Sequence, residues 1–218
     1  MAPVLAYWDI RGLAQPIRLL LAYTGTEFED KYYVCGPAPD YDKSCWFDVK
    51  YTLGLDFPNL PYYIDGDVKL TQSNAILRYI GGKHNLLGST EKERIRVNLM
   101  ENELGDFRSV WVGLCYNPDF ENLKSSYHND LPQKLGALSK FLGGNKWLAG
   151  ENITIVDFIL YEMLDQHLIF DEKCLNDFGN LNAFHERFRA LEKIEAYMKS
   201  KKFISHPLNN KRAKFGNQ

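Results

Sequence analysis

The chain has 218 residues, a length that fits one large domain or two small ones and is enough to bury a hydrophobic core. Hydrophobic residues make up 45% of it and charged residues 25%, ordinary values that argue against a disordered, collagen-like or coiled-coil protein. The 26 Lys and Arg residues nearly balance the 28 Asp and Glu residues. The net charge of -2 therefore gives no bulk attraction to nucleic acid or to an anionic membrane.

The apolar stretches and the cysteines indicate the cellular compartment in which the protein is expected. No apolar run approaches the roughly 20 residues that cross a bilayer, and the N-terminus lacks the basic and apolar segments of a secretory signal. Cys35, Cys45, Cys115 and Cys174 show neither CxxC nor zinc spacing, and the five histidines are scattered. We therefore expect a cytoplasmic protein with reduced thiols and no metal site.

The first part of the chain alternates between strand and helix patterns. A β-prone run is followed by Gly12 and then by a helical pattern that carries Pro16 in its first turn. Further on, a turn at Asp65-Gly66-Asp67 separates two short β runs. The pattern predicts strands over 3–8 and 28–34, a hairpin over 62–64 and 68–70, and helices over 14–23 and 73–82. This order is typical of a thioredoxin-like domain with a short or irregular middle helix.

The rest of the chain reads as helices only. Thr90 and Glu93 form a capping box before a long helix that Asn117-Pro118 ends, and Thr154 with Asp157 indicates another N-cap. Further helices are predicted over 131–142, 155–170 and 183–198, and the one over 155–170 is apolar on nearly every face, as a central buried helix would be. We expect an α/β plus all-α fold: a thioredoxin-like domain over 1–83, a linker over 84–90 and an all-helical domain over 91–218.

Tyr7 is the first candidate functional residue. It lies near the end of the first predicted strand, where open α/β sheets place ligands, although an aromatic side chain in a strand is more often plain core. Four sequence motifs bear on which of these two interpretations of Tyr7 applies. They are YWDIRGLAQPIR at 7–18, LGLDFPNLPY at 53–62, LTQSNAILR at 70–78 and LCYNPDF at 114–120. In this order and register they resemble the mu-class glutathione S-transferases over nearly the whole chain.

The resemblance implies a cytoplasmic, homodimeric detoxification enzyme that transfers small hydrophobic electrophiles to the sulfur of glutathione, EC 2.5.1.18 in type. Glutathione would be a co-substrate, with no permanently bound cofactor, and the helical domain would contribute the acceptor site. Two alternatives remain open: a carrier that binds hydrophobic ligands without turnover, and a glutathione-dependent isomerase. The sequence does not decide which electrophile is used.

The resemblance also implies the catalytic and glutathione-binding residues. Tyr7 would donate a hydrogen bond to the thiol sulfur, and Tyr116 would bring a second phenol to the electrophile. Asn59-Leu60-Pro61 would bind the cysteinyl part beside a cis proline, Gln72-Ser73 the γ-glutamyl carboxylate, and Trp46 and Lys50 the glycyl carboxylate. Asp106 would reach the α-amine of glutathione in the other subunit. The full set is Tyr7, Trp8, Leu13, Lys43, Trp46, Lys50, Asn59, Leu60, Pro61, Gln72, Ser73 and Asp106.

The acceptor site and the dimer interface follow from the same resemblance. The acceptor would lie against Leu13, Cys35, Val112, Tyr116, Leu208, Asn209 and Asn210. Cys35, Asn209 and Asn210 depart from the family pattern, so we expect a wider and more polar acceptor pocket. Phe57 would insert into a hydrophobic pocket of the partner subunit, and Arg78 would lie at the same interface.

Overall fold

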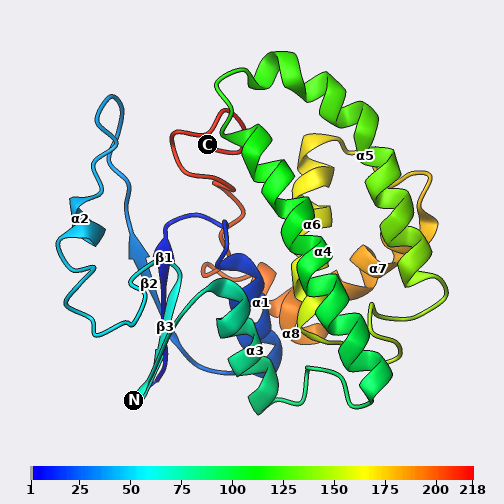
Figure 1. The fold of residues 1–218 in the computed structure, drawn as a ribbon, viewed down its shortest axis with the longest axis horizontal. Helices are drawn as coiled ribbons and strands as arrows, with labels where there is room; N and C mark the ends of the chain where they lie inside the picture. The colour runs from blue at the N-terminus through cyan, green and yellow to red at the C-terminus, as the bar shows by residue number, and fades with distance from the viewer. Residues whose placement is uncertain (1) are drawn as a thin grey trace.

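The computed structural model describes residues 2–218, and its N-terminal part is built on one mixed sheet (Figure 1). The strands are β1 (Val4–Trp8), β2 (Glu29–Tyr33), β3 (Tyr62–Asp65) and β4 (Val68–Thr71), in the order β2-β1-β3-β4. Strands β1 and β2 are parallel, whereas β1 with β3 and β3 with β4 are antiparallel. The strands follow one another along the chain as predicted, and the hairpin lies at the predicted turn.

Three helices accompany the sheet: α1 (Gln15–Thr24), α2 (Ser44–Phe47) and α3 (Ser73–Lys83). In Figure 1, α1 and α3 lie between the sheet and the remaining helices, while α2 lies on the opposite side of the sheet. The middle helix has only four residues and is thus short, as expected. Helix α1 ends at Gly25, whose φ of 72° is the left-handed cap conformation that glycine adopts without strain.

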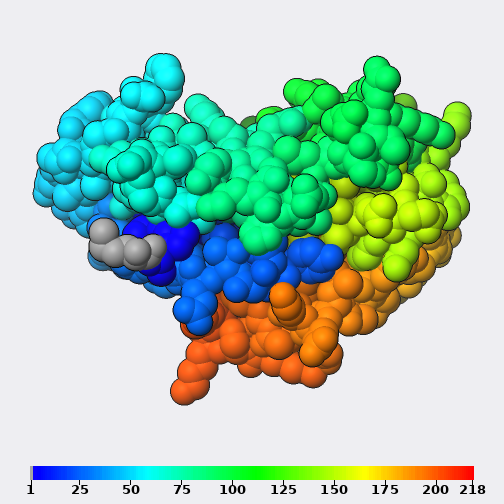
Figure 2. Space-filling view, turned by 90° about the horizontal axis from the view of Figure 1, so that it is seen from below, coloured from blue at the N-terminus to red at the C-terminus, as the bar shows by residue number. Residues whose placement is uncertain are grey.

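The helical part consists of α4 (Glu91–Cys115), α5 (Phe120–Leu142), α6 (Ile155–Phe170), α7 (Gly179–Arg189) and α8 (Glu192–Met198). Helix α6 is buried along most of its length and contacts α1, α4 and α7, so it is the predicted central helix. Figure 2 shows the orange C-terminal part against the blue N-terminal part, in agreement with the contact between α8 and α1. The α/β plus all-α fold is confirmed, and the division at 83 and 91 stays a prediction.

Two helix predictions were wrong in extent. The helix expected from Leu131 begins at Phe120, whose buried ring anchors the first turn. The prediction missed this start because residues 121–130 are mostly polar and carry little apolar periodicity. The single helix expected over 183–198 is two helices. Its break falls at Leu191, whose backbone is extended (ψ 124°), and no glycine or proline announces it.

Both predicted capping boxes are present, and the one before α6 is buried. The Asp157 carboxylate accepts hydrogen bonds from the Thr154 backbone N–H at 2.7 Å and from the Leu148 N–H at 2.8 Å. The matching box before α4 joins Thr90 and Glu93 at the surface. None of the helices described over 2–218 is both long and apolar enough to cross a membrane.

Replacing Asp157 with Ala is expected to lower the free energy of unfolding by about 3 kcal/mol, because two buried N–H groups lose their acceptor. Glu93→Ala removes the corresponding carboxylate of the exposed box and should cost about 1 kcal/mol. Urea unfolding of both variants measures the difference. Equal losses would show that burial of Asp157 adds nothing to its capping role.

Candidate active site

The Tyr7 phenol lies beneath the loop of residues 9–13, which we call the Gly12 loop. Its side chain is 7% exposed, and the Leu13 backbone N–H hydrogen-bonds to its oxygen. Gly12 has φ +44°, and a Cβ at this position would stand 2.6 Å from Cε1 of the Tyr7 ring. Only glycine therefore fits against the ring. Because the phenol oxygen accepts from Leu13, its own proton stays free for another acceptor.

The electrostatic surroundings keep that proton on Tyr7. Burial raises the pKa of the Tyr7 phenol, and the positive charge of Arg108 and the Leu13 N–H oppose this rise only in part. At neutral pH the group is a hydrogen-bond donor. Arg108, on α4, is half-buried and also lies near Tyr116.

No role was predicted for Arg108 from the sequence. The signal was present, because Arg108, Val112 and Tyr116 are spaced four residues apart and therefore share one face of α4.

The Gly12 loop is held to the helical domain by a buried ion cluster. The Arg11 guanidinium donates to both carboxylate oxygens of Glu162, at 3.0 and 2.6 Å, and to Asp165 at 2.7 Å. The pKa of Asp165 is about 2, because hydrogen bonds from His185 and Arg11 and their charges outweigh its burial. Arg18 donates to the Ile10 carbonyl from the other side at 2.8 Å. The loop is thus held from both α1 and α6.

Replacing Gly12 with Ala is expected to lower kcat/KM for the reaction at Tyr7 by about tenfold, because the new Cβ displaces the phenol. Gly66→Ala is the matched control, since Gly66 also has a positive φ of 59° but a Cβ there meets nothing within 4 Å. Both variants carry the backbone cost of a left-handed residue. Equal kcat/KM values for the two would contradict the steric argument.

The predicted pair Trp46 and Lys50 does not share a helical face, because α2 ends at Phe47. The Trp46 ring is buried against Tyr33 and Tyr62, with ring centroids 5.3 and 6.0 Å away. Lys50 lies in the following turn, where its ammonium is 5.3 Å from the centroid of the Tyr51 ring. The two residues predicted for the glycyl carboxylate thus come from a short helix and from the turn after it.

Two further predicted segments lie at strand and helix ends. The Leu60–Pro61 peptide bond is cis, and the Leu60 N–H donates to the Asn59 side chain at 2.9 Å. Gln72, with φ +70°, is the N-cap of α3, and Ser73 is the first residue of the helix rather than its cap. Among the residues that the structure describes, no side chain caps this N-terminus, so its first N–H groups and its helix dipole are available to an anion.

The side chains predicted to meet a partner subunit are exposed. Phe57 is 76% exposed, and Asp106 lines a groove of about 390 Å³ between α4 and α5. Arg78 donates to Glu101 at 2.7 Å and also bonds Asn98, so its guanidinium is already held against α4.

Tyr116 and Asn210, both predicted for the acceptor, meet at one cavity. The Asn210 backbone N–H donates to the Tyr116 hydroxyl oxygen at 2.7 Å. Beside them is a cavity of about 520 Å³, here called the Tyr116 cavity, which lies between the loop before α2, the end of α4 and the C-terminal tail. Its lining residues are Tyr41, Lys43, Tyr116, Pro118, Asn210, Arg212 and Lys214.

Three residues predicted for the acceptor are buried instead. Leu208 is completely buried under Gly216, and Cys35 is completely buried with its Sγ 3.6 Å from the Tyr41 carbonyl oxygen. The Asn209 amide donates to the Phe215 carbonyl at 3.0 Å. Cys35 and Asn209 therefore do not widen an open pocket. Val112 and Leu13 are partly buried, and Leu13 belongs to the Gly12 loop above Tyr7.

Comparisons with known proteins agree with this geometry. The family models for the N-terminal and C-terminal domains of glutathione S-transferases match residues 3–82 and 105–201. Glutathione S-transferase Mu 5 of Mus musculus is 59% identical, and Mu 3 of Homo sapiens 58%, each match covering 99% of this chain and 96% of the relative. The crystal structure of the glutathione S-transferase Blo t 8 has a TM-score of 0.90 at 33% identity, covering 98% of this chain and 99% of that one.

The chain therefore belongs to the glutathione S-transferase family. Within it, relatives that are 56–59% identical over nearly its full length are mu-class proteins, so the predicted class is confirmed. Among residues 2–218, no three His, Cys, Asp or Glu side chains are grouped as metal ligands.

Proposed function

We propose that the chain conjugates the glutathione thiolate to small hydrophobic electrophiles, with Tyr7 as the hydrogen-bond donor to the sulfur. The observation that carries this proposal is the buried phenol whose oxygen accepts from Leu13 and whose proton is left free. Family membership makes the chain a glutathione transferase of the EC 2.5.1.18 type, with glutathione as co-substrate and no permanent cofactor.

The chemical task is to form a thiolate at neutral pH. An unperturbed thiol has a pKa of about 8.5, and each unit of lowering requires about 1.4 kcal/mol of preferential thiolate stabilisation. A fixed O–H donor in a site with little water supplies energy of this kind. The positive charge of Arg108 beside Tyr7 favours the anion further.

The remaining groups of glutathione each find a matching feature. The open N-terminus of α3 at Ser73 suits the γ-glutamyl carboxylate, with Gln72 beside it. Lys43 and Lys50, one on each side of the short helix α2 that carries Trp46, are cations for the glycyl carboxylate. The Leu60 backbone suits the cysteinyl part, since a peptide can add to an extended segment as a short strand does. Trp8 and Leu13 complete the set around Tyr7.

We extend the proposal to a cytoplasmic homodimer. Phe57, Ile95, Leu99 and Val110 are all more than half exposed, as apolar side chains of an interface are in a single subunit. In a dimer with two-fold symmetry, Phe57 of each copy would enter the other, with Arg78 nearby and Asp106 reaching the partner's glutathione. The four unpaired cysteines support a reducing compartment.

The carrier and isomerase alternatives are not favoured, because the relatives over the full chain are transferases by name. The test is turnover of glutathione with 1-chloro-2,4-dinitrobenzene by the purified protein. Binding of the acceptor without product would support the carrier. Isomerisation of an unsaturated ketone without formation of a glutathione conjugate would support the isomerase.

A further inference from the structure

The mouth of the Tyr116 cavity is basic. Lys43 reaches it from the residue just before α2, and Arg212 and Lys214 reach it from the C-terminal tail. None of the described residues that line it carries a carboxylate. None of these three cations forms an ion pair with a carboxylate in the part of the chain that the structure describes. Because Lys43 is already proposed for the glycyl carboxylate of glutathione, the charges of Arg212 and Lys214 are the ones available to an acceptor.

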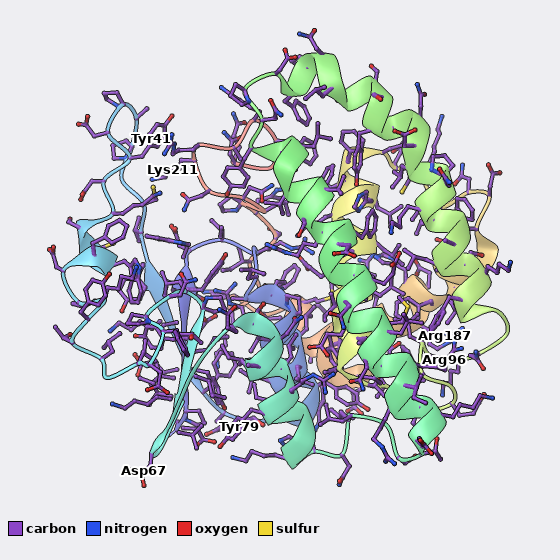
Figure 3. All side chains as sticks on the ribbon, viewed as in Figure 1. Tyr41, Asp67, Tyr79, Arg96, Arg187 and Lys211 are labelled. Carbon is purple, nitrogen blue, oxygen red and sulfur yellow. The ribbon has the colours of Figure 1, made fainter. Side chains whose placement is uncertain are left out.

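The tail keeps these cations at the cavity. The Lys211 ammonium donates to the Cys35 carbonyl at 2.6 Å, and the Asn210 N–H donates to Tyr116. Figure 3 shows Lys211 and Tyr41 side by side at one end of the molecule, and the Arg212 guanidinium lies 5.8 Å from the centroid of the Tyr41 ring. The tail is thus bonded on both sides of the cavity, and Arg212 and Lys214 are not on a free end.

Two carboxylates lie on neighbouring elements, but neither lines the cavity. Asp42, beside Lys43, accepts from the N–H and hydroxyl of Ser44, and Asp119, beyond Pro118, accepts from the Asn122 amide. These neutral donors leave the negative charges in place, so the two carboxylates weaken the field of the lining cations from outside the cavity. Glu162 is paired with Arg11. Arg108, near Tyr116, adds a fourth cation on the Tyr7 side. Cations around a concave surface raise the local concentration of anions.

We propose that the acceptor site is selective for hydrophobic electrophiles that carry a carboxylate, with Arg212 and Lys214 as its specificity-determining residues. This inference rests on the proposed conjugation at Tyr7. The aromatic body of the acceptor lies against Tyr116, and its carboxylate lies at the basic mouth. In the reaction the thiolate sulfur forms a bond to the aryl carbon, the carbon–chlorine bond breaks, and chloride leaves with the electron pair. The carboxylate itself is unchanged.

The experiment compares 4-chloro-3,5-dinitrobenzoate with the neutral 4-chloro-3,5-dinitrobenzamide. Each kcat/KM is divided by the rate constant of the uncatalysed reaction with glutathione, and the ratio of the two quotients is the selectivity. We expect the unmodified enzyme to favour the benzoate. In the double variant R212Q/K214Q the selectivity should fall roughly five- to tenfold, since each exposed charge pair contributes modestly. High salt should lower it as well.

The matched control is K201Q/K202Q. It removes the same net charge from exposed lysines in the same part of the chain, but these lysines line a different cavity beside Tyr197 and Phe28. Its selectivity should equal that of the unmodified enzyme. A similar fall in the control, an unchanged ratio in R212Q/K214Q, or no preference in the unmodified enzyme would each overturn the proposal.

Failure of the proposed conjugation would give a different result from failure of the proposed selectivity. Tyr7→Phe should lower the rates with both acceptors and leave their ratio in place. If the unmodified enzyme turned over neither acceptor, conjugation itself would be refuted. The proposed selectivity would then be tested by the equilibrium binding of the two compounds to the unmodified protein and to R212Q/K214Q. Quenching of tryptophan fluorescence measures this binding. Equal affinities would refute it.

Discussion

Tyr7→Phe is expected to lower kcat/KM for glutathione conjugation by about 100-fold, the usual cost of removing one fixed donor to a developing negative charge. The pKa of the bound thiol should rise by about 2 units, which corresponds to about 2.7 kcal/mol. Glutathione affinity should change little, because the carboxylates and the cysteinyl backbone are bound elsewhere. Absorbance of the bound thiolate across a pH series measures the pKa, and calorimetry measures the affinity.

A suitable control is Tyr32→Phe. Tyr32 faces Tyr7 in the register of β1 and β2, but it is 41% exposed and its hydroxyl donates only to Asp30. This variant should keep its full rate. Tyr7→Phe at full rate would sink the assignment of the thiol donor, and a large loss of glutathione affinity would mean that the phenol holds the substrate rather than activating it.

Phe57→Ala is expected to weaken dimerisation by about 4 kcal/mol, within the range of hot-spot truncations, because each dimer loses two inserted rings. Analytical ultracentrifugation over a concentration series measures the dissociation constant. Because Asp106 is proposed to serve the opposite subunit, the resulting monomers should also bind glutathione more weakly.

Tyr51→Ala provides the comparison, since Tyr51 is 78% exposed in the same domain and so removes a similar aromatic surface. Its dimer should remain as stable as that of the unmodified protein. Unchanged sedimentation of Phe57→Ala at low concentration would reject the insertion of Phe57. Intact glutathione affinity in true monomers would instead reject only the role of Asp106.

The sequence predicts those parts of the fold that local chemistry decides. The helix starts at Thr90 and Thr154 were found because a hydroxyl and an acid three residues apart satisfy backbone N–H groups on the spot. Asp119 stands at the N-cap of α5, but its side chain makes no capping hydrogen bond and the polar residues after it show little apolar periodicity. The break at Leu191 has no glycine or proline to mark it. Pattern alone could not place them.

The candidate site, like the fold, could be predicted from the sequence only in part. Periodicity put Tyr7 near a strand end, but only the family resemblance gave it a task, since a buried phenol and a catalytic phenol have the same pattern. Arg108 was readable from its spacing with Tyr116 and was missed. The burial of Cys35 and Asn209 could not be predicted, because it depends on the course of the tail across the other domain.

The tail also has a consequence for the order in which the molecule is completed. The N–H groups of Arg11 and Gly12 donate to the carbonyls of Pro207 and Leu208, almost the whole chain away. A nascent polypeptide that has already exposed the entire thioredoxin-like part on the ribosome still lacks these acceptors. The strands and helices around Tyr7 are available early in synthesis, whereas the final seating of the loop above it must wait until residues 207 and 208 have emerged.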